Sequence, residues 1–317
     1  MTQNSINPEV PIFAWHRKLL AAAAIFTVLL IAMGGVLCVT QSIRSCPDWP
    51  GCFGRFIPPL ETSPILEYTH RALAAISALL ILASAIAGLV WTRRLHWIVF
   101  PPLAAGVLLV EVSYFGARVV LYGITPGWAA VDVGSALLAT ALMVTVAVVA
   151  QARKSQPAMP DRISFRNPLA RLVLATVIIV YGVLVSGVLV AGKSSISGCL
   201  GWPIYSPRLF QVDLPGAGNI LRLALSGIGI LLMIVTFVQA WRRRREQPAV
   251  FRSARWVLAA FLLEALVQVL LLIFGFKISL LVIYTVSAAL FWGLLVALGA
   301  SVGLESAYQL SARIEAG

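Results

Sequence analysis

The sequence is poor in charged residues and poorer still in histidine. Only 11% of the 317 residues are charged, 12 of them are acidic, and there are 3 histidines and 4 cysteines. Because 60% of the residues are hydrophobic and the mean hydropathy is +0.93, a soluble domain of this length could not bury the apolar surface. The few cysteines and histidines also disfavour a zinc site, since no second close pair completes four ligands.

The sequence contains long apolar runs in which charged residues are rare. Runs of about twenty apolar residues are the signal of membrane-spanning helices. They are continuous rather than alternating, which disfavours strands, and an open sheet cannot sit in lipid. The sequence therefore predicts an all-α polytopic membrane protein with eight spanning helices, at roughly 19–41, 67–91, 97–121, 128–150, 169–192, 218–240, 255–275 and 279–302.

The net charge of +12 has a distribution that indicates topology. Basic residues gather in alternate loops, including Arg93 and Arg94 and the run Arg242–Arg245. The positive-inside rule then predicts both termini in the cytoplasm and the long loops 42–66 and 193–217 outside. The basic clusters are interpreted as anchors that meet anionic lipid headgroups, and we expect no nucleic-acid partner. The predicted location is the cytoplasmic membrane of a bacterium or archaeon.

The order of elements repeats within the chain. Residues 35–50 and 187–203 both begin with Gly-Val-Leu and both reach Cys-x-x-Trp-Pro, and the stretch from Asp132 to Ser135 matches the stretch from Tyr284 to Ser287. These matches predict two duplicated four-helix bundles, at 1–155 and 165–317, joined by a solvated cytoplasmic linker at 156–164. Four helices return the chain to the same side, so the two halves are expected to have parallel topology.

Besides Glu67, which begins the second span, three acidic residues fall inside predicted spans: Glu111, Asp132 and Glu264. A carboxylate in lipid costs several kcal/mol, so each is a candidate functional residue. Glu111 and Glu264 sit at comparable places in the two halves, and charge pairing for helix packing is as good an explanation as a site. Arg118 is an expected partner for Asp132 or Glu67 near the outer face.

The second predicted span begins with Glu67-Tyr68-Thr69-His70-Arg71. Glu67 could serve only the helix dipole and Arg71 could snorkel to the interface, but this explanation leaves His70 without a role. Glu67 and His70 are three residues apart and share one helix face, which favours a pocket there. Trp49, Trp128 and Trp202 at the outer boundary are interpreted as an aromatic belt.

Together these motifs resemble those of the haem A synthase family. The resemblance rests on the eight duplicated spans and on four groups of residues. These are Gly34-Gly35; the loop Cys46-Pro47-Asp48-Trp49-Pro50-Gly51-Cys52 with Gly54 and Ile57-Pro58; Glu67-x-x-His70-Arg71; and Gly123-Ile124-Thr125-Pro126. Such enzymes oxidise the C8 methyl of haem O to a formyl group. The resemblance implies a substrate haem (haem O or haem A) in the N-terminal half, a haem b in the C-terminal half, and a glutamate needed for activity.

The family holds its two haems with four histidines, and this sequence retains one of them. Glu67 and His70 match, with His70 as the expected ligand of haem iron. The other ligand positions fall on Asp132, Leu221 and Tyr284. Leu221 cannot ligate and Tyr284 could do so only as a phenolate, so a C-terminal haem b is not expected. Asp132 could hold water or a proton on an open face of the haem, and Arg71 and Arg222 are expected to pair with haem propionates.

The cysteines admit several arrangements. Cys46 and Cys52, on an outer loop, could form a structural disulfide, act as a redox pair or hold a haem side chain. Cys199 would then be unpaired, or either of these two could bridge to it. Cys38 lies inside the first predicted helix.

Three functions compete. The first is a haem A synthase-like oxidoreductase with one surviving site, acting with haem O synthase and cytochrome oxidase assembly proteins, as the resemblance implies. The second is a non-catalytic haem-binding or oxidase-assembly factor of the same family. A membrane transporter is third, supported only by the duplicated halves and the buried acids.

Overall fold

The computed structural model describes residues 12–156, 159, 161–190, 199–202 and 217–316. Within this part, all eight helices are long and apolar enough to cross a membrane, so the predicted all-α membrane fold is confirmed. They are α1 (Ala14–Val39), α2 (Thr62–Trp91), α3 (His96–Tyr122), α4 (Pro126–Ser155), α5 (Pro168–Val190), α6 (Ala217–Arg242), α7 (Pro248–Phe274) and α8 (Ile278–Ala316).

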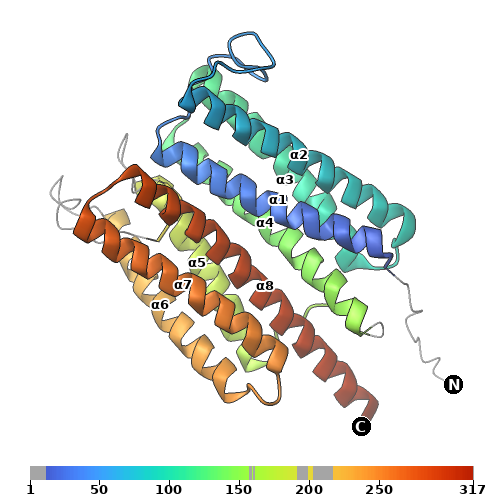
Figure 1. The fold of residues 1–317 in the computed structure, drawn as a ribbon. Helices are drawn as coiled ribbons and strands as arrows, with labels where there is room; N and C mark the ends of the chain where they lie inside the picture. Colours follow the sequence, from blue (N-terminus) through green and yellow to red (C-terminus); the bar gives the residue numbers. More distant parts are fainter. Residues whose placement is uncertain (1–11, 157–158, 160, 191–198, 203–216, 317) are drawn as a thin grey trace.

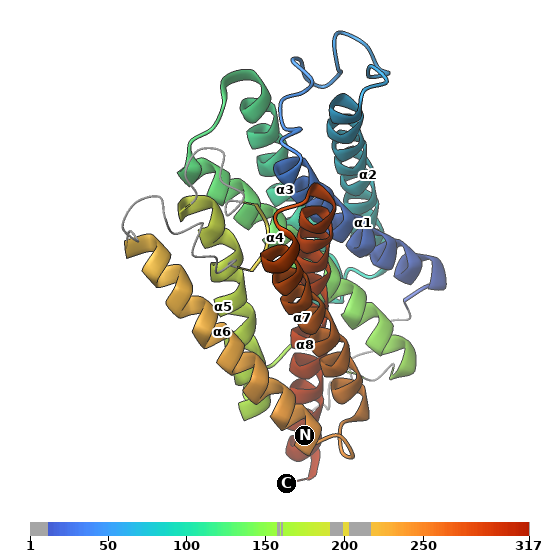
Figure 2. The same cartoon turned by 60° about the vertical axis from the view of Figure 1, so that its left-hand side comes forward.

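The helices form two groups that follow the order of the chain. Neighbours pack as α1 with α2, α3 with α4, α5 with α6 and α7 with α8, while α1 and α4 also contact α8. Figure 1 shows α1–α4 on one side and α5–α8 on the other, and Figure 2 shows α4 and α5 side by side. The beginning of α1 and the end of α8 lie at one end of the molecule, and the loop between α1 and α2 lies at the other.

The two groups meet along a seam that depends on small residues. A β-carbon at Gly35 of α1 would lie 2.7 Å from Cβ of Thr285 in α8, and one at Gly293 would lie 3.1 Å from Val28. Small residues let helix backbones approach closely in a membrane, where packing drives association. The indole N–H of Trp292 donates to the carbonyl of Leu137 at 3.0 Å and joins α8 to α4.

Glycine ends two of the helices in the same way. Gly123 after α3 has φ 79° and Gly275 after α7 has φ 80°, a left-handed conformation that glycine adopts without steric cost. Each is followed by two residues before the next helix begins at Pro126 or Ile278. These tight connections fix α4 against α3 and α8 against α7.

Several helices begin or end some residues away from the predicted bounds. The last helix extends to Ala316, well past residue 302. The segment predicted as a solvated linker is partly packed: Met159 is buried, and Arg153 Nη1 donates to its carbonyl at 2.6 Å. Asp161 accepts hydrogen bonds from the first two backbone N–H groups of α3, at His96 and Trp97, which satisfies two donors that the helix itself leaves unpaired.

Candidate functional site

A cavity of about 660 Å³ lies mainly among the first four helices, near the end that carries the α1–α2 loop, and Val188, Cys199 and Leu200 of the second half complete its lining. This volume is in the usual range for a small-molecule or cofactor pocket. Its wall on α2 presents Ala72, Ala75 and Ala78, which leave a broad apolar face. The loop residues Trp49 and Phe56 border it, and both are exposed, so the cavity opens on the loop side.

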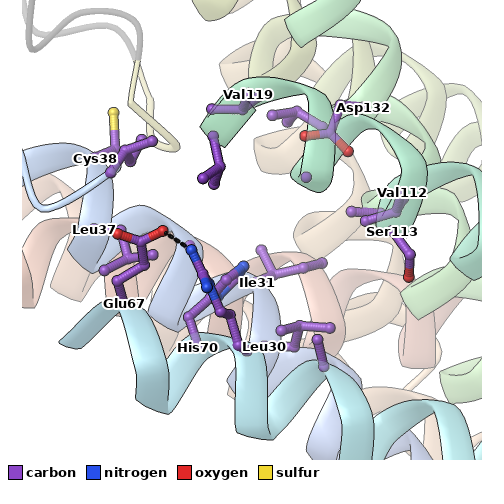
Figure 3. Close-up of a pocket in the computed structure, with 18 of the residues that line it drawn as sticks. Leu30, Ile31, Leu37, Cys38, Glu67, His70, Val112, Ser113, Val119 and Asp132 are labelled. Atoms are coloured by element: carbon purple, nitrogen blue, oxygen red, sulfur yellow. Dashed lines mark hydrogen bonds and ion pairs between the residues drawn. The ribbon is translucent and has the colours of Figure 1, made fainter. Parts of the chain in front are cut away.

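His70 and Asp132 lie on opposite sides of this cavity. Figure 3 shows His70 projecting from α2 and Asp132 standing across from it on α4. Nδ1 of His70 and Oδ1 of Asp132 are both buried and have no hydrogen-bond partner among the described residues. A buried polar atom without a partner is costly, so the arrangement favours a ligand between them. The absence of a side chain at Gly34 leaves room for the imidazole, because a β-carbon there would lie 3.4 Å from His70 Cε1.

Glu67 and Arg71, one helical turn apart, form an ion pair at 2.6 Å. Glu67 is 4% exposed, and its second oxygen accepts hydrogen bonds from the Ser45 hydroxyl at 3.0 Å and the Cys46 N–H at 2.8 Å. One oxygen of the carboxylate is therefore bound by the chain leaving α1 and the other by Arg71. It does not reach toward Asp132.

Arg71 completes the attachment of the loop. Its Nη1 donates to the carbonyl of Asp48 at 2.7 Å and to the carbonyl of Gly51, and its Nη2 donates to Glu67. These are charge-assisted bonds, which are stronger than neutral ones. Nη1 of the guanidinium is thus engaged by the loop whose residues 49–51 line the cavity, and Nη2 is engaged by Glu67. We refer to Glu67 and Arg71 as the loop clamp.

Inside the loop, Asp48 forms a second anchor. Its carboxylate accepts hydrogen bonds from the N–H groups of Phe53, at 2.6 Å, and Gly54. These donors, Gly54 first, lower the pKa of the Asp48 carboxyl from its ordinary value of 3.8. Phe53 and Gly54 both have positive φ, which turns the chain back so that both N–H groups point at Asp48.

All four cysteines are paired. The structure joins Cys46 to Cys52, one of the arrangements that the sequence left open, and both are fully buried. The other disulfide joins Cys38 of α1 to Cys199. The expectation of an unpaired Cys199, or of a bridge from Cys46 or Cys52, was wrong. Cys38 lies inside a helix, as the sequence predicted, and its place near the C-terminal end of α1 brings it within reach of the second half.

The acids elsewhere in the spans pair with serines. Ser135 donates to Glu111 at 3.0 Å, and Ser287 donates to Glu264. Arg118 lies over the ring of Tyr122, 5.7 Å from its centroid. It forms no ion pair with Asp132 or Glu67 among the residues described, so that expectation was wrong.

In the second half, Trp202 enters the interior. It is 4% exposed and packs edge-on against Phe261 and Phe291, with ring centroids 5.7 and 6.4 Å apart. A β-carbon at Gly229 of α6 would lie 2.8 Å from its ring. The interpretation of Trp202 as part of an aromatic belt was wrong, whereas Trp49 and Trp128 are exposed.

Polar side chains hold the backbone beside Trp202. The Tyr284 hydroxyl donates to the carbonyl of Trp202, and the backbone N–H of Trp202 donates to Glu264 at 3.4 Å. Arg222 Nη2 donates to the carbonyl of Gly201 at 3.4 Å. Leu221 is 60% exposed, so its side chain points away from this interior.

The model of the cytochrome oxidase assembly protein family (COX15-CtaA) matches residues 17–296. The chain belongs to this family. The chain is similar to the Heme A synthase of Exiguobacterium sibiricum, with 31% identity over 199 residues that cover 60% of this chain and 65% of that protein. The Heme A synthase of Geobacillus thermodenitrificans is 26% identical over 256 residues, 78% of each chain. The Heme A synthase of Bacillus pumilus is 29% identical over 140 residues, which cover 42% of this chain and 44% of that protein.

Membership of the cytochrome oxidase assembly family implies haem-related chemistry, and the first half fits a haem. Imidazole is a common axial ligand of haem iron, and His70 presents one at the wall of a large apolar cavity with a buried, unpartnered nitrogen. Asp132 opposite is a poor iron ligand but can hold a water molecule or a proton. His16 is fully buried at the other end of α1 and stacks on Trp15, so it takes no part in this cavity.

The second half does not fit a haem. Of the two positions where the sequence resemblance implies haem ligands, one carries Leu221, whose side chain faces outward, and the other carries Tyr284, whose hydroxyl is bound to the Trp202 carbonyl. Trp202 itself fills the space between α6, α7 and α8. Arg222 contacts the backbone of Gly201. We therefore assign no cofactor to this half.

Proposed function

We propose that this protein oxidises the C8 methyl group of haem O to the formyl group of haem A, with the porphyrin held in the cavity and its iron bound to His70. The observation that carries the proposal is the buried, unpartnered nitrogen of His70 at the wall of this cavity, in a chain similar to proteins named Heme A synthase. The conversion of –CH₃ to –CHO consumes two O₂, four electrons and four protons and yields three waters.

When bound, the haem iron supplies the oxygen chemistry, and the side chains around it have separate roles. His70 orients the ring, and Asp132 holds a water molecule or a proton on the opposite side. Glu67 and Arg71 act as positioning residues, because their hydrogen bonds go to the loop that borders the cavity. Arg71 is accordingly not available to a propionate through its terminal nitrogens.

The duplicated architecture, with its division at 1–155 and 165–317, is part of the same proposal. Two pairs of contacts support it. In the first half, Arg71 donates to the carbonyl of the residue before Trp49, which is Asp48. In the second half, Arg222 donates to the carbonyl of the residue before Trp202, which is Gly201. Ser135 and Ser287 donate to Glu111 and Glu264 in the same manner. We place both termini in the cytoplasm and the cavity mouth outside, in a bacterial or archaeal cytoplasmic membrane.

A second candidate is a haem-binding or oxidase-assembly factor without oxidase activity, working beside haem O synthase. The interior of α5–α8 favours it, because Trp202 occupies the place where an electron-donating haem would be expected. This function needs the cavity and His70 but no source of electrons.

Co-expression with haem O synthase, in a host that makes no haem A, separates the two candidates. The enzyme produces haem A, detected by chromatography of extracted haems, and His70→Ala abolishes it. His96→Ala is the matched control, because that imidazole stacks on Phe100 at the far end of the bundle. Haem O bound to the purified protein, with no haem A formed, would support the assembly factor instead.

A further inference from the structure

The disulfide between Cys38 and Cys199 differs from the other one in its surroundings. Cys38 and Cys199 both line the cavity, and Figure 3 shows the Cys38 sulfur near its edge. Cys46 and Cys52 are fully buried and do not line it. A thiol that enters the cavity from the loop side therefore meets the Cys38–Cys199 bond first.

This disulfide also joins elements that are otherwise far apart in the chain. The two cysteines are separated by 161 residues, compared with 6 for the other pair. Cys199 packs in a small cluster with Leu271 of α7 and Leu281 and Tyr284 of α8. The bond thus fastens the outer end of α1 to the second half, at the boundary of the cavity.

Once this bond opens, hydrogen bonds still hold the neighbouring segment. Gly201 and Trp202 remain attached through Arg222, Tyr284 and Glu264. The two thiols therefore stay close to each other after reduction and can be oxidised again. Cys199 is buried, whereas Cys38 is partly exposed and gives a reagent in the cavity access to the bond. A disulfide with one accessible cysteine, whose reduced form is held in place, has the properties of a reversible exchange site.

We propose that Cys38–Cys199 is a thiol–disulfide exchange site whose substrate is a dithiol reductant that enters the cavity from the loop side. A thiolate of the reductant attacks one sulfur of the bond, forming a mixed disulfide and releasing the other cysteine as a thiolate. The second thiol of the reductant then closes its own disulfide and releases the first cysteine. Two electrons and two protons pass to the chain, which ends with two thiols.

The exchange alters the wall of the cavity. Without the covalent tie, the hydrogen bonds at Gly201 and Trp202, rather than a covalent bond, restrain Cys199 and Leu200 beside the end of α1, and both parts line the pocket. Cys46–Cys52 has a structural role, because the loop clamp binds the Ser45 hydroxyl and the Cys46 N–H and also the carbonyls of Asp48 and Gly51 between the two cysteines. The proposal does not depend on haem oxidation.

Equilibration of the full-length protein in detergent with mixtures of reduced and oxidised dithiothreitol tests the proposal. Free thiols are alkylated and located by peptide mass spectrometry. Cys38 and Cys199 should be alkylated together at a reduced-to-oxidised ratio at least about tenfold lower than Cys46 and Cys52, a difference of ~30 mV. Simultaneous opening, the reverse order, or protection of Cys38 until the protein unfolds would overturn it.

Single substitutions give a second measurement on the folded protein. Cys38→Ser should leave Cys199 open to a maleimide reagent, whereas Cys46→Ser should leave Cys52 unlabelled. Equal labelling of the two variants would also contradict the assignment. Performed on haem-free protein, both measurements keep their meaning even if the protein proves not to bind haem.

Discussion

Glu67→Gln is the substitution that most sharply tests the loop clamp. Glu67 is buried and accepts hydrogen bonds from Ser45, the Cys46 N–H and Arg71. Glutamine has the same size, but it has no charge and turns an NH₂ group toward these donors. A hydrogen bond to a charged group contributes about 1.5–3 kcal/mol. We expect opening of the loop to become easier by ~2–3 kcal/mol, because one bond is lost outright and another is weakened.

Hydrogen exchange followed by mass spectrometry measures this change at the Cys46 amide. An easing of ~2–3 kcal/mol corresponds to exchange about 30- to 150-fold faster, at 1.4 kcal/mol per factor of ten. Glu61→Gln is the matched control, since Glu61 is an exposed loop carboxylate with no capping hydrogen bond. Unchanged exchange at Cys46 in Glu67→Gln, or equal acceleration in both variants, would refute the clamp.

Three further changes have defined outcomes. Trp202→Ala should lower the free energy of unfolding by about 3–5 kcal/mol, as for other buried aromatic residues, whereas Trp49→Ala should change it little because Trp49 is exposed. Denaturant titration compares the two variants, and equal effects would contradict the buried position of Trp202. Hydrogen bonds lower the pKa of Asp48, so its carboxylate stabilises the loop at pH values above the ordinary pKa near 3.8, and this contribution disappears as the pH falls through the lowered pKa. Hydrogen exchange of the loop amides, measured as a function of pH, checks this. Asp48→Asn should remove the pH dependence. Gly34→Leu should displace His70 and reduce haem binding, measured by spectral titration, with wild-type affinity as the refuting result.

The fold was predictable from the sequence because each span carries its own signal. A continuous run of apolar residues can satisfy its backbone only as a helix in lipid, and nothing in the tertiary structure overrides that requirement. The helix ends were less certain. The structure begins α2 at Thr62 and extends α8 to Ala316, both outside the spans predicted from hydropathy.

The site was only partly predictable. His70 stood out because histidine is scarce and Glu67 shares its helix face. The hydrogen-bond partners of Glu67 and Arg71 could not be predicted from their spacing, because these partners are backbone atoms of a loop about twenty residues earlier in the chain. Asp132 was found as an acid in a span, and its place across from His70 depends on how α2 and α4 each pack against α1 and α3.

Long-range pairing escaped the sequence almost entirely. Cys38 and Cys199 carry no local sign that they meet, since the contact depends on how α1 packs against α8. Trp202 shares its local motif with Trp49, yet one side chain enters a bundle and the other is exposed. Gly229 leaves room for the Trp202 ring, but the sequence alone does not indicate this role, because it depends on the packing of α6.

The amount of haem per chain tests the central claim most directly. Protein purified from cells that make haem O is assayed for haem by its pyridine complex and for protein by amino-acid analysis. We expect one haem per chain in the wild type and in Tyr284→Phe, and none in His70→Ala. Two haems per chain, loss of haem in Tyr284→Phe, or full retention in His70→Ala would contradict a single site held by His70 in the first four helices.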